Sequence, residues 1–245
     1  MVDWTAFWSH WAWPMATGII VTLFTFLLFR QFFERRKYHQ LAWTIGFLMF
    51  AIAAFMEAYS ELVNDWNPTV YRIYIVMAGV LVGFLGLGTF YLIVRKEIIG
   101  HIYMMINIAL MGVFLFGTFT VDLIDGALIA GVTVGGEPLG ASGSFPRVMS
   151  MLFTIPGTIL LIGGSIYSII FFARKKQFSY RVWANVLIIL GTLVIAGAGG
   201  RARAGDPAGL YPAEMLAAAI LLCGFLKAST LQKGAEIKKA LRKEK

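Results

Sequence analysis

Apolar residues fill most of this chain in long stretches, and short polar segments interrupt them at regular intervals. Each stretch is close to the length of about 20 residues that an α-helix needs to cross a bilayer. We therefore expect an all-α membrane protein, a bundle of seven transmembrane helices. The predicted helices span residues 12–30, 41–62, 70–95, 101–123, 147–173, 183–199 and 211–230. Residues 1–230 then form one transmembrane domain, and residues 231–245 form a basic tail.

The connecting segments alternate between basic segments and segments rich in glycine and proline, and this alternation predicts the orientation. The basic set holds 17 of the 21 lysines and arginines. The other set holds only Arg72, Arg147, Arg201 and Arg203. Because cytoplasmic loops carry the excess of positive charge, the N-terminus is expected outside and the C-terminus in the cytoplasm.

Composition supports the same class of protein. The chain is 59% hydrophobic and 14% charged, too few charges to cover a soluble surface. We predict a multi-pass protein of the cell membrane. The net charge of +8 falls mainly on the predicted cytoplasmic face, where anionic headgroups account for it without nucleic acid. Bound membrane lipid is expected, and no cofactor is predicted.

The six later helices read as three tandem hairpins. The second helix of each begins with a proline-containing segment, in order "NPTVYR", "SGSFPR" and "GLYPAE". Two interpretations stand: a triplicated hairpin, or the general look of a helix that enters the membrane from outside. Small residues such as Gly79 and Gly83 predict close helix packing, within one protomer or in a homo-oligomer.

The first thirteen residues hold four of the seven tryptophans. Indole rings favour the membrane interface, so Trp4, Trp8, Trp11 and Trp13 predict an interfacial anchor. The alternatives are docking to a partner and axial ligation of a haem or pigment by His10. No other histidine lies on the same side, and no metal site is predicted.

Acidic residues gather on the outer half and predict the main candidate site. Glu57 and Glu61 are one turn apart and share a helix face. Ionisable groups at membrane depth usually face the bundle interior or a water cavity. We predict a ligand or ion site, or else a structural ion-pair network, formed by Glu57, Glu61, Asp122, Asp125, Arg72 and Arg147.

A second candidate lies near the start of the last helix. Five glycines between Gly197 and Gly209 are expected to unwind the preceding helix. Arg201 and Arg203 then stand near a helix N-terminus, where an anion or a lipid headgroup is favoured. A flexible loop that meets outer-leaflet phosphates is the equal alternative.

No constellation for catalysis is recognisable, so no enzyme activity is predicted. The leading hypothesis is a non-catalytic membrane subunit or receptor-like module that acts through partners in a membrane assembly. Its polar outer mouth would bind a small ligand. The alternative is a small-solute or ion transporter that uses the outer carboxylates, and the third is a pigment- or haem-associated redox subunit.

Overall fold

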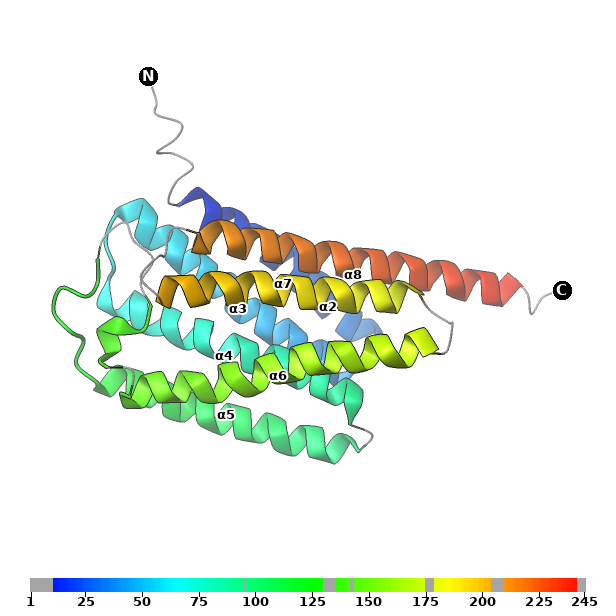
Figure 1. The fold of residues 1–245 in the computed structure, drawn as a ribbon, viewed down its shortest axis with the longest axis horizontal. Coiled ribbons are helices and arrows are strands. Elements are labelled where there is room, and N and C mark those ends of the chain that lie inside the picture. The colour runs from blue at the N-terminus through cyan, green and yellow to red at the C-terminus, as the bar shows by residue number, and fades with distance from the viewer. Residues whose placement is uncertain are drawn as a thin grey trace, which may run out of the picture.

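The computed structural model describes residues 11–94, 96–129, 135–141, 143–174, 179–203 and 209–241, with backbone alone for 179–181, 202–203, 225 and 227–241. Within these ranges the chain forms long α-helices and no strand. The helices are α2 (Ala12–Arg35), α3 (Tyr38–Val63), α4 (Pro68–Ile93), α5 (Glu97–Thr120), α6 (Phe145–Arg174), α7 (Ser179–Arg203) and α8 (Leu210–Leu241), and a 3-10 helix, η1 (Glu137–Leu139), precedes α6. They lie side by side in an elongated bundle (Figure 1).

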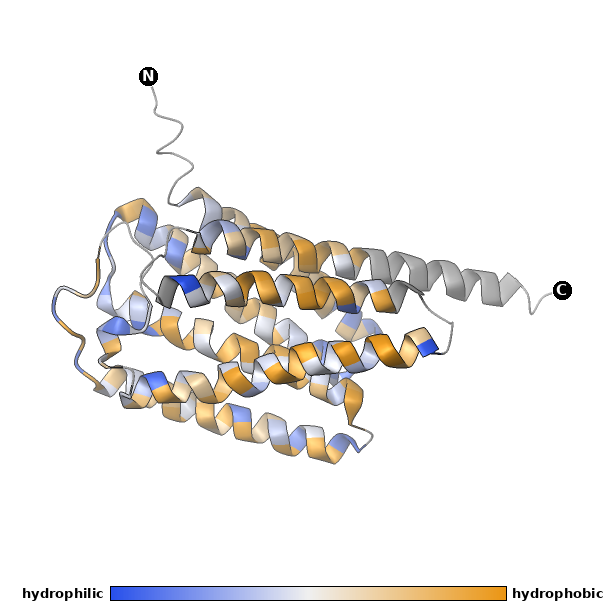
Figure 2. Cartoon of the chain, viewed as in Figure 1, coloured by the Kyte–Doolittle hydropathy of each residue, from blue (hydrophilic) through white to orange (hydrophobic). Residues whose placement is uncertain are grey.

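The prediction of an all-α chain is confirmed within the described residues. Six helices, α2 to α7, are long and apolar enough to cross a membrane. In α8 the residues with described side chains give a shorter apolar stretch, Leu210–Gly224, and the helix itself continues to Leu241. Hydrophobic residues cover the helix exteriors along most of their length (Figure 2), and rings such as Phe26 and Phe116 are exposed there. The molecule is therefore built as a membrane protein.

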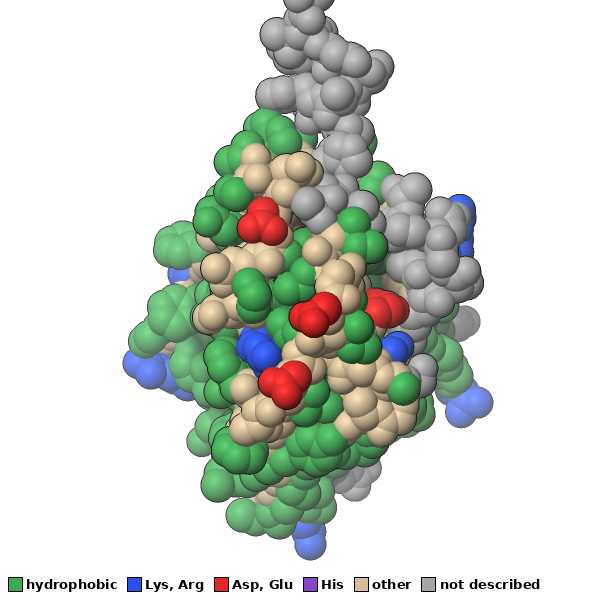
Figure 3. All heavy atoms as spheres, turned by 90° about the vertical axis from the view of Figure 1, so that its left-hand side faces the viewer, with side chains coloured by type: hydrophobic (Ala, Val, Ile, Leu, Met, Phe, Trp, Pro, Cys, Tyr) green, Lys and Arg blue, Asp and Glu red, His purple; other side chains and the backbone are tan. Residues whose placement is uncertain are grey.

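The two ends of the bundle differ in charge. At one end, where α3 is followed by α4, the exposed side chains include Asp65, Asp122, Asp125 and Glu137. We call it the acidic end, and Figure 3 views the molecule from this side. At the other end, where α2 is followed by α3, the exposed side chains include Arg36, Lys37, Lys96 and Arg174. We call it the basic end.

Local signals explain where several helices begin and end. Asn67 caps α4, because its side-chain oxygen accepts hydrogen bonds from the backbone N–H groups of Thr69 and Val70 at 2.9 and 3.3 Å. Pro68 follows at the first helical position, where its missing N–H costs nothing. Arg36 and Asn64 end α2 and α3 in the left-handed conformation, with φ of 52° and 55°.

Six helices close into a ring. Around it α2 packs on α3, α3 on α4, α4 on α6, α6 on α7, α7 on α8 and α8 on α2. The remaining helix, α5, packs mainly against α4 and α6, on the outside of the ring. The first and last helices of the ring are thus neighbours, and the interior of the ring is where polar groups can be withdrawn from lipid.

The contact between α4 and α6 depends on two glycines. A Cβ atom added at Gly86 would lie 2.6 Å from the Cα atom of Gly157, and one at Gly157 would lie 2.4 Å from the carbonyl oxygen of Val82. The two backbones therefore touch directly, as small residues allow in membrane helices. Pro156 lies inside α6, and the helix continues past it. This glycine seam is internal to one chain.

The three predicted hairpins are not packed alike. The pairs α3–α4 and α7–α8 contact each other extensively, whereas α6 packs more on α4 than on α5. On the other face of α4, the indole N–H of Trp43 donates to the carbonyl oxygen of Leu85 at 3.1 Å. The same ring lies against Gly88, where an added Cβ would come within 2.2 Å of it. Helix α4 is thereby fixed between α3 and α6.

Candidate functional site

Glu57 and Glu61 lie on the buried face of α3, near the acidic end. Their exposed fractions are 2% and 6%. They are one helical turn apart, so one face of α3 brings both carboxyl groups into the interior of the ring. Most acids of membrane helices are held this way, because an ionisable group that faces lipid is costly.

Helices α8 and α4 supply the partners of these two carboxyl groups. The hydroxyl of Tyr211 donates to Oε1 of Glu61 at 2.7 Å, in a buried contact. The side chain of Glu57 is hydrogen-bonded to Tyr74 of α4 and to Glu214 of α8. Tyr211 and Glu214 are three residues apart in the first turns of α8 and therefore share a face. We call these five residues the carboxyl–tyrosine cluster.

The chemistry of the cluster follows from the charged groups that are described around Glu57. The charged groups that act on Glu57 are Glu214 and Glu61, both acidic. A hydrogen bond between two carboxyl groups requires a proton, since two carboxylates offer only acceptors. The Glu57–Glu214 pair is therefore able to share a proton. The remaining oxygen of Glu214, Oε2, is buried and has no hydrogen-bond partner among the described residues.

Within the described residues, no three side chains of His, Cys, Asp or Glu converge on a point where they could hold a metal. Three carboxyl groups lie close to one another in the cluster, beside the hydroxyls of Tyr74 and Tyr211. The cluster can hold, gain or lose a proton, and it ties α3, α4 and α8 together.

The other residues predicted for this site lie apart from the cluster. Asp122 and Asp125 are exposed, just after the end of α5. Arg72 donates a hydrogen bond to the backbone carbonyl of Thr118, at the end of α5, and its guanidinium lies 5.9 Å from the ring centre of Phe119. The sequence grouped these residues with Glu57 because all of them fall on the same predicted side of the membrane. In the structure they lie at or beside the end of α5, whereas Glu57 lies on the buried face of α3.

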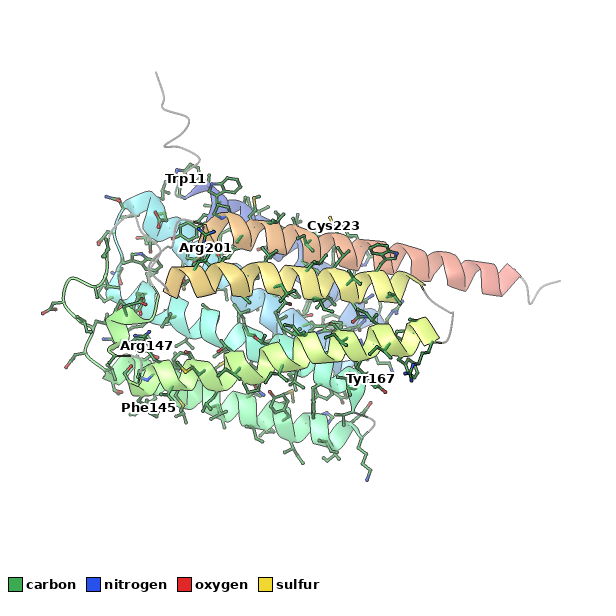
Figure 4. The ribbon with its side chains drawn as sticks, in the orientation of Figure 1. Trp11, Phe145, Arg147, Tyr167, Arg201 and Cys223 are labelled. Atoms are coloured by element: carbon green, nitrogen blue, oxygen red, sulfur yellow. The ribbon has the colours of Figure 1, made fainter. Side chains whose placement is uncertain are left out.

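Arg147 lies at the acidic end of α6 (Figure 4) and bonds to the connection between α5 and α6. It donates to the carbonyl oxygen of Gly140 at 2.9 Å. The hydroxyl of Tyr71 donates to the carbonyl oxygen of Gly135, also at 2.9 Å. These two bonds flank η1 and hold the described part of the α5–α6 connection over the end of the bundle.

The second predicted site falls on the last turn of α7. Arg201 is exposed there, beside the first turns of α8 in Figure 4, and Arg203 is described by its backbone only. The expectation that the glycines unwind this end is wrong as far as Arg203, because α7 stays helical through Gly197, Gly199 and Gly200. In an apolar surrounding, backbone N–H and C=O groups must bond to each other, and this outweighs the low helix propensity of glycine.

The tryptophan-rich start is described only in part. Trp4, Trp8 and His10 lie outside the described residues. Trp11 precedes α2, and Trp13 lies in its first turn, half-buried. The hydroxyl of Thr17 donates to the carbonyl oxygen of Trp13 at 3.0 Å. Trp11 lies at the acidic end of the bundle, on its outside (Figure 4).

Sequence reasoning missed Tyr74, Tyr211 and Glu214 as members of the site. The available signal was the spacing within two helix starts: "YRIY" places Tyr71 and Tyr74 on one face of α4, and "YPAE" does the same for Tyr211 and Glu214 of α8. Comparisons of this chain with protein-family models, with curated proteins and with solved structures found no match.

Proposed function

We propose that this protein is a non-catalytic, receptor-like module of the cell membrane that acts through partners. In this proposal all seven helices cross the bilayer, with the acidic end outside and the basic end in the cytoplasm. The distribution of lysine and arginine supports that orientation. The carboxyl–tyrosine cluster is then the sensing part, and no bond of a substrate is made or broken.

One observation carries the proposal, namely the course of α8. This helix holds Tyr211 and Glu214 in the cluster and then runs unbroken to Leu241. Its 32 residues make it about 48 Å long at ~1.5 Å per residue. It passes the other helices at the basic end (Figure 1). A displacement of its first turn is therefore transmitted along one rigid element to the opposite face of the membrane.

The proton of the Glu57–Glu214 pair supplies a two-state element. With the proton in place, the two carboxyl groups attract and hold α8 against α3. Without it, two like charges face each other in a buried site, beside a third carboxyl group at Glu61 and the hydroxyls of Tyr74 and Tyr211. Like charges at close range in a poorly hydrated interior repel strongly, so α8 moves away from α3.

Cys223 offers a direct test, since it is the single cysteine of the chain and is exposed on α8. It lies between Glu214 and the basic end, on the outward side of the helix (Figure 4). The full chain, labelled there with an environment-sensitive fluorophore and placed in lipid nanodiscs, is titrated from acid to alkaline pH. We expect a cooperative change of emission as the shared proton is lost.

Glu214→Gln removes the titration and keeps a hydrogen-bonding side chain, so its emission is expected to stay constant over the same range. Asp125→Asn is the matched control, because Asp125 is an exposed acid at the same end. Its titration should resemble that of the wild type. An unchanged titration in Glu214→Gln contradicts the proposal.

A second candidate function, proton-coupled transport, is favoured by the depth of the same proton-sharing pair within α3. Under this function the wild type reconstituted in liposomes carries a proton flux, and Glu57→Gln reduces it sharply. Absence of flux in the wild type removes transport and leaves the sensing role. The third function, a pigment or haem subunit, depends on His10, and a colourless purified protein excludes it.

A further inference from the structure

A large cavity lies inside the helix ring at the basic end, far from the carboxyl–tyrosine cluster. Its volume is about 670 Å³, and segments of all six ring helices line it. Ligand pockets of proteins measure roughly 300–1,000 Å³, so the space is large enough for a small molecule or one lipid chain. Nothing in the proposed sensing function uses this cavity.

The interior of the cavity is apolar. Phe24, Leu28, Phe47 and Leu161 line it, and all four belong to one buried hydrophobic cluster. Such walls exclude water and favour a hydrocarbon chain, because burial of apolar surface stabilises by about 25 cal/mol per Å².

The mouth of the cavity is polar, with an arginine and a lysine beside a histidine. Arg35, Lys37 and His39 line it where α2 is followed by α3. Of the described residues that line the cavity, none is acidic. Anionic headgroups of a bilayer are drawn to basic positions of this kind.

Gln40 places a hydrogen-bond acceptor without a described partner beside the cavity. Its side chain lines the cavity and the residue is only 3% exposed, yet Oε1 has no hydrogen-bond partner among the described residues. Buried polar atoms are nearly always bonded, so an unpartnered acceptor that faces a cavity indicates a donor on the molecule that fills it. A molecule that satisfies this acceptor would carry a hydroxyl or an amine.

The cavity also reaches the lipid-facing side of α6. Tyr167 and Phe171 line it and are themselves 56% and 40% exposed. In Figure 4 Tyr167 lies on the half of α6 that is nearer the basic end. A second hollow of about 330 Å³, bounded by Tyr167, Ile170, Phe171 and Arg174, continues from these rings. A chain from the surrounding bilayer can thus enter at the level of the basic end.

We propose that this cavity binds one anionic membrane lipid whose headgroup bears hydroxyl groups, of the phosphatidylglycerol type. The phosphate meets Arg35 and Lys37 at the mouth, and a glycerol hydroxyl donates to Oε1 of Gln40. The hydrocarbon chain lies among the rings and leucines of the interior. The site is independent of the proposed sensing function, because it shares no residue with the carboxyl–tyrosine cluster.

Native mass spectrometry of the delipidated full chain, titrated with single lipids, tests the proposal. The probes are phosphatidylglycerol, phosphatidylmethanol, phosphatidylcholine and oleate. Phosphatidylmethanol has the charge without the hydroxyls, and phosphatidylcholine lacks the net charge. We expect phosphatidylglycerol to bind about fivefold more tightly than phosphatidylmethanol, which is the effect of about one hydrogen bond, and phosphatidylcholine to bind least.

Two variants assign this preference to the cavity. Gln40→Leu removes the acceptor without leaving a partner unbonded, so the preference over phosphatidylmethanol should fall to about one. Arg35→Gln should weaken both anionic phospholipids by a similar factor, ~3-fold or more. Arg30→Gln is its control, because Arg30 lies on the same helix, is exposed, pairs with Glu34 at 3.1 Å and does not line the cavity.

Three outcomes overturn the proposal. One is a hydroxyl preference that survives Gln40→Leu. The second is equal weakening by Arg30→Gln and Arg35→Gln, which would reflect general surface charge. The third is tighter binding of oleate than of phosphatidylglycerol, which would make the occupant a free fatty acid. Each readout is the ratio of the affinities of two lipids for the same protein sample. Partial unfolding of a variant reduces the binding of both lipids together and therefore does not imitate the expected change in this ratio.

Discussion

Glu61 and Tyr211 show most directly how single side chains hold the cluster together. Their hydrogen bond measures 2.7 Å and is buried, and it joins α3 to the first turn of α8. Loss of the tyrosine hydroxyl leaves a buried carboxyl oxygen with one bond fewer, and a buried group that loses its partner costs about 1–3 kcal/mol.

Tyr211→Phe is therefore expected to lower the free energy of unfolding by about 1–3 kcal/mol. Thermal unfolding of the detergent-solubilised protein measures it, as a lower midpoint temperature. Tyr59→Phe is the control: Tyr59 lies on α3 close to Glu61 in sequence, but its side chain is 51% exposed. Equal midpoints for the two variants would argue against a structural role of the Tyr211 hydroxyl.

At the residue scale the sequence predicted two of the five members of the cluster. The one-turn spacing of Glu57 and Glu61 placed them on a shared, inward face, and the structure has them there. Their partners were not predictable, because Tyr211 is 150 residues from Glu61 along the chain and only helix packing brings it near. Arg72 donates instead to a backbone carbonyl. An arginine at a helix end finds such acceptors closer than a carboxylate on another helix.

At the scale of elements, hydropathy predicted the approximate positions of the helices, and six of them are long and apolar enough to cross a membrane. Their ends were harder to place. Helix α2 continues to Arg35, beyond its apolar stretch, and α7 continues through its glycines. The close approach of α4 and α6 at Gly86 and Gly157 was not predictable either. The sequence shows where small residues lie along a helix, but it does not show which neighbouring helix each of them faces.

Gly157→Ala is expected to be strongly destabilising, because its Cβ would lie 2.4 Å from the carbonyl oxygen of Val82, a backbone atom that cannot turn aside. We expect a loss of about 1–3 kcal/mol, as for overpacked cores. Gly163→Ala is the matched control on the same helix, with no atom within 4 Å of its added Cβ.

The control substitution should stabilise α6 slightly, since alanine has the higher helix propensity. Thermal midpoints of the two variants in the same detergent give the comparison. If Gly157→Ala unfolds no earlier than Gly163→Ala, the backbone contact between α4 and α6 is not a determinant of stability.

At the scale of the whole molecule, the ring of six helices gives two separate interiors, one acidic and tyrosine-lined, the other apolar with a basic mouth. The orientation that we propose puts the first near the outside and the second near the cytoplasm. The uneven distribution of lysine and arginine could be seen in the sequence. The closure of the ring by α2 and α8 could not be predicted, since it depends on packing between opposite ends of the chain.

The orientation predicts how the two ends react with a membrane-impermeant maleimide. In a Cys223→Ala background, Asp125→Cys should be labelled on intact cells. Lys37→Cys, exposed at the basic end, should be labelled only after the membrane is permeabilised. The opposite pattern would invert the proposed topology, and labelling of both variants on intact cells would show that the two ends do not lie on opposite sides.

The closure of the ring by its first and last helices also bears on how the protein is made. Helices enter the membrane in chain order during synthesis, so Glu57 and Glu61 are inserted long before Tyr211 and Glu214 exist. Until α8 arrives, the two glutamates face an open gap, and so does the lipid-sized cavity that α8 helps to enclose. A chain that stops before α8 lacks the Tyr211 and Glu214 side chains that lie against these two acids.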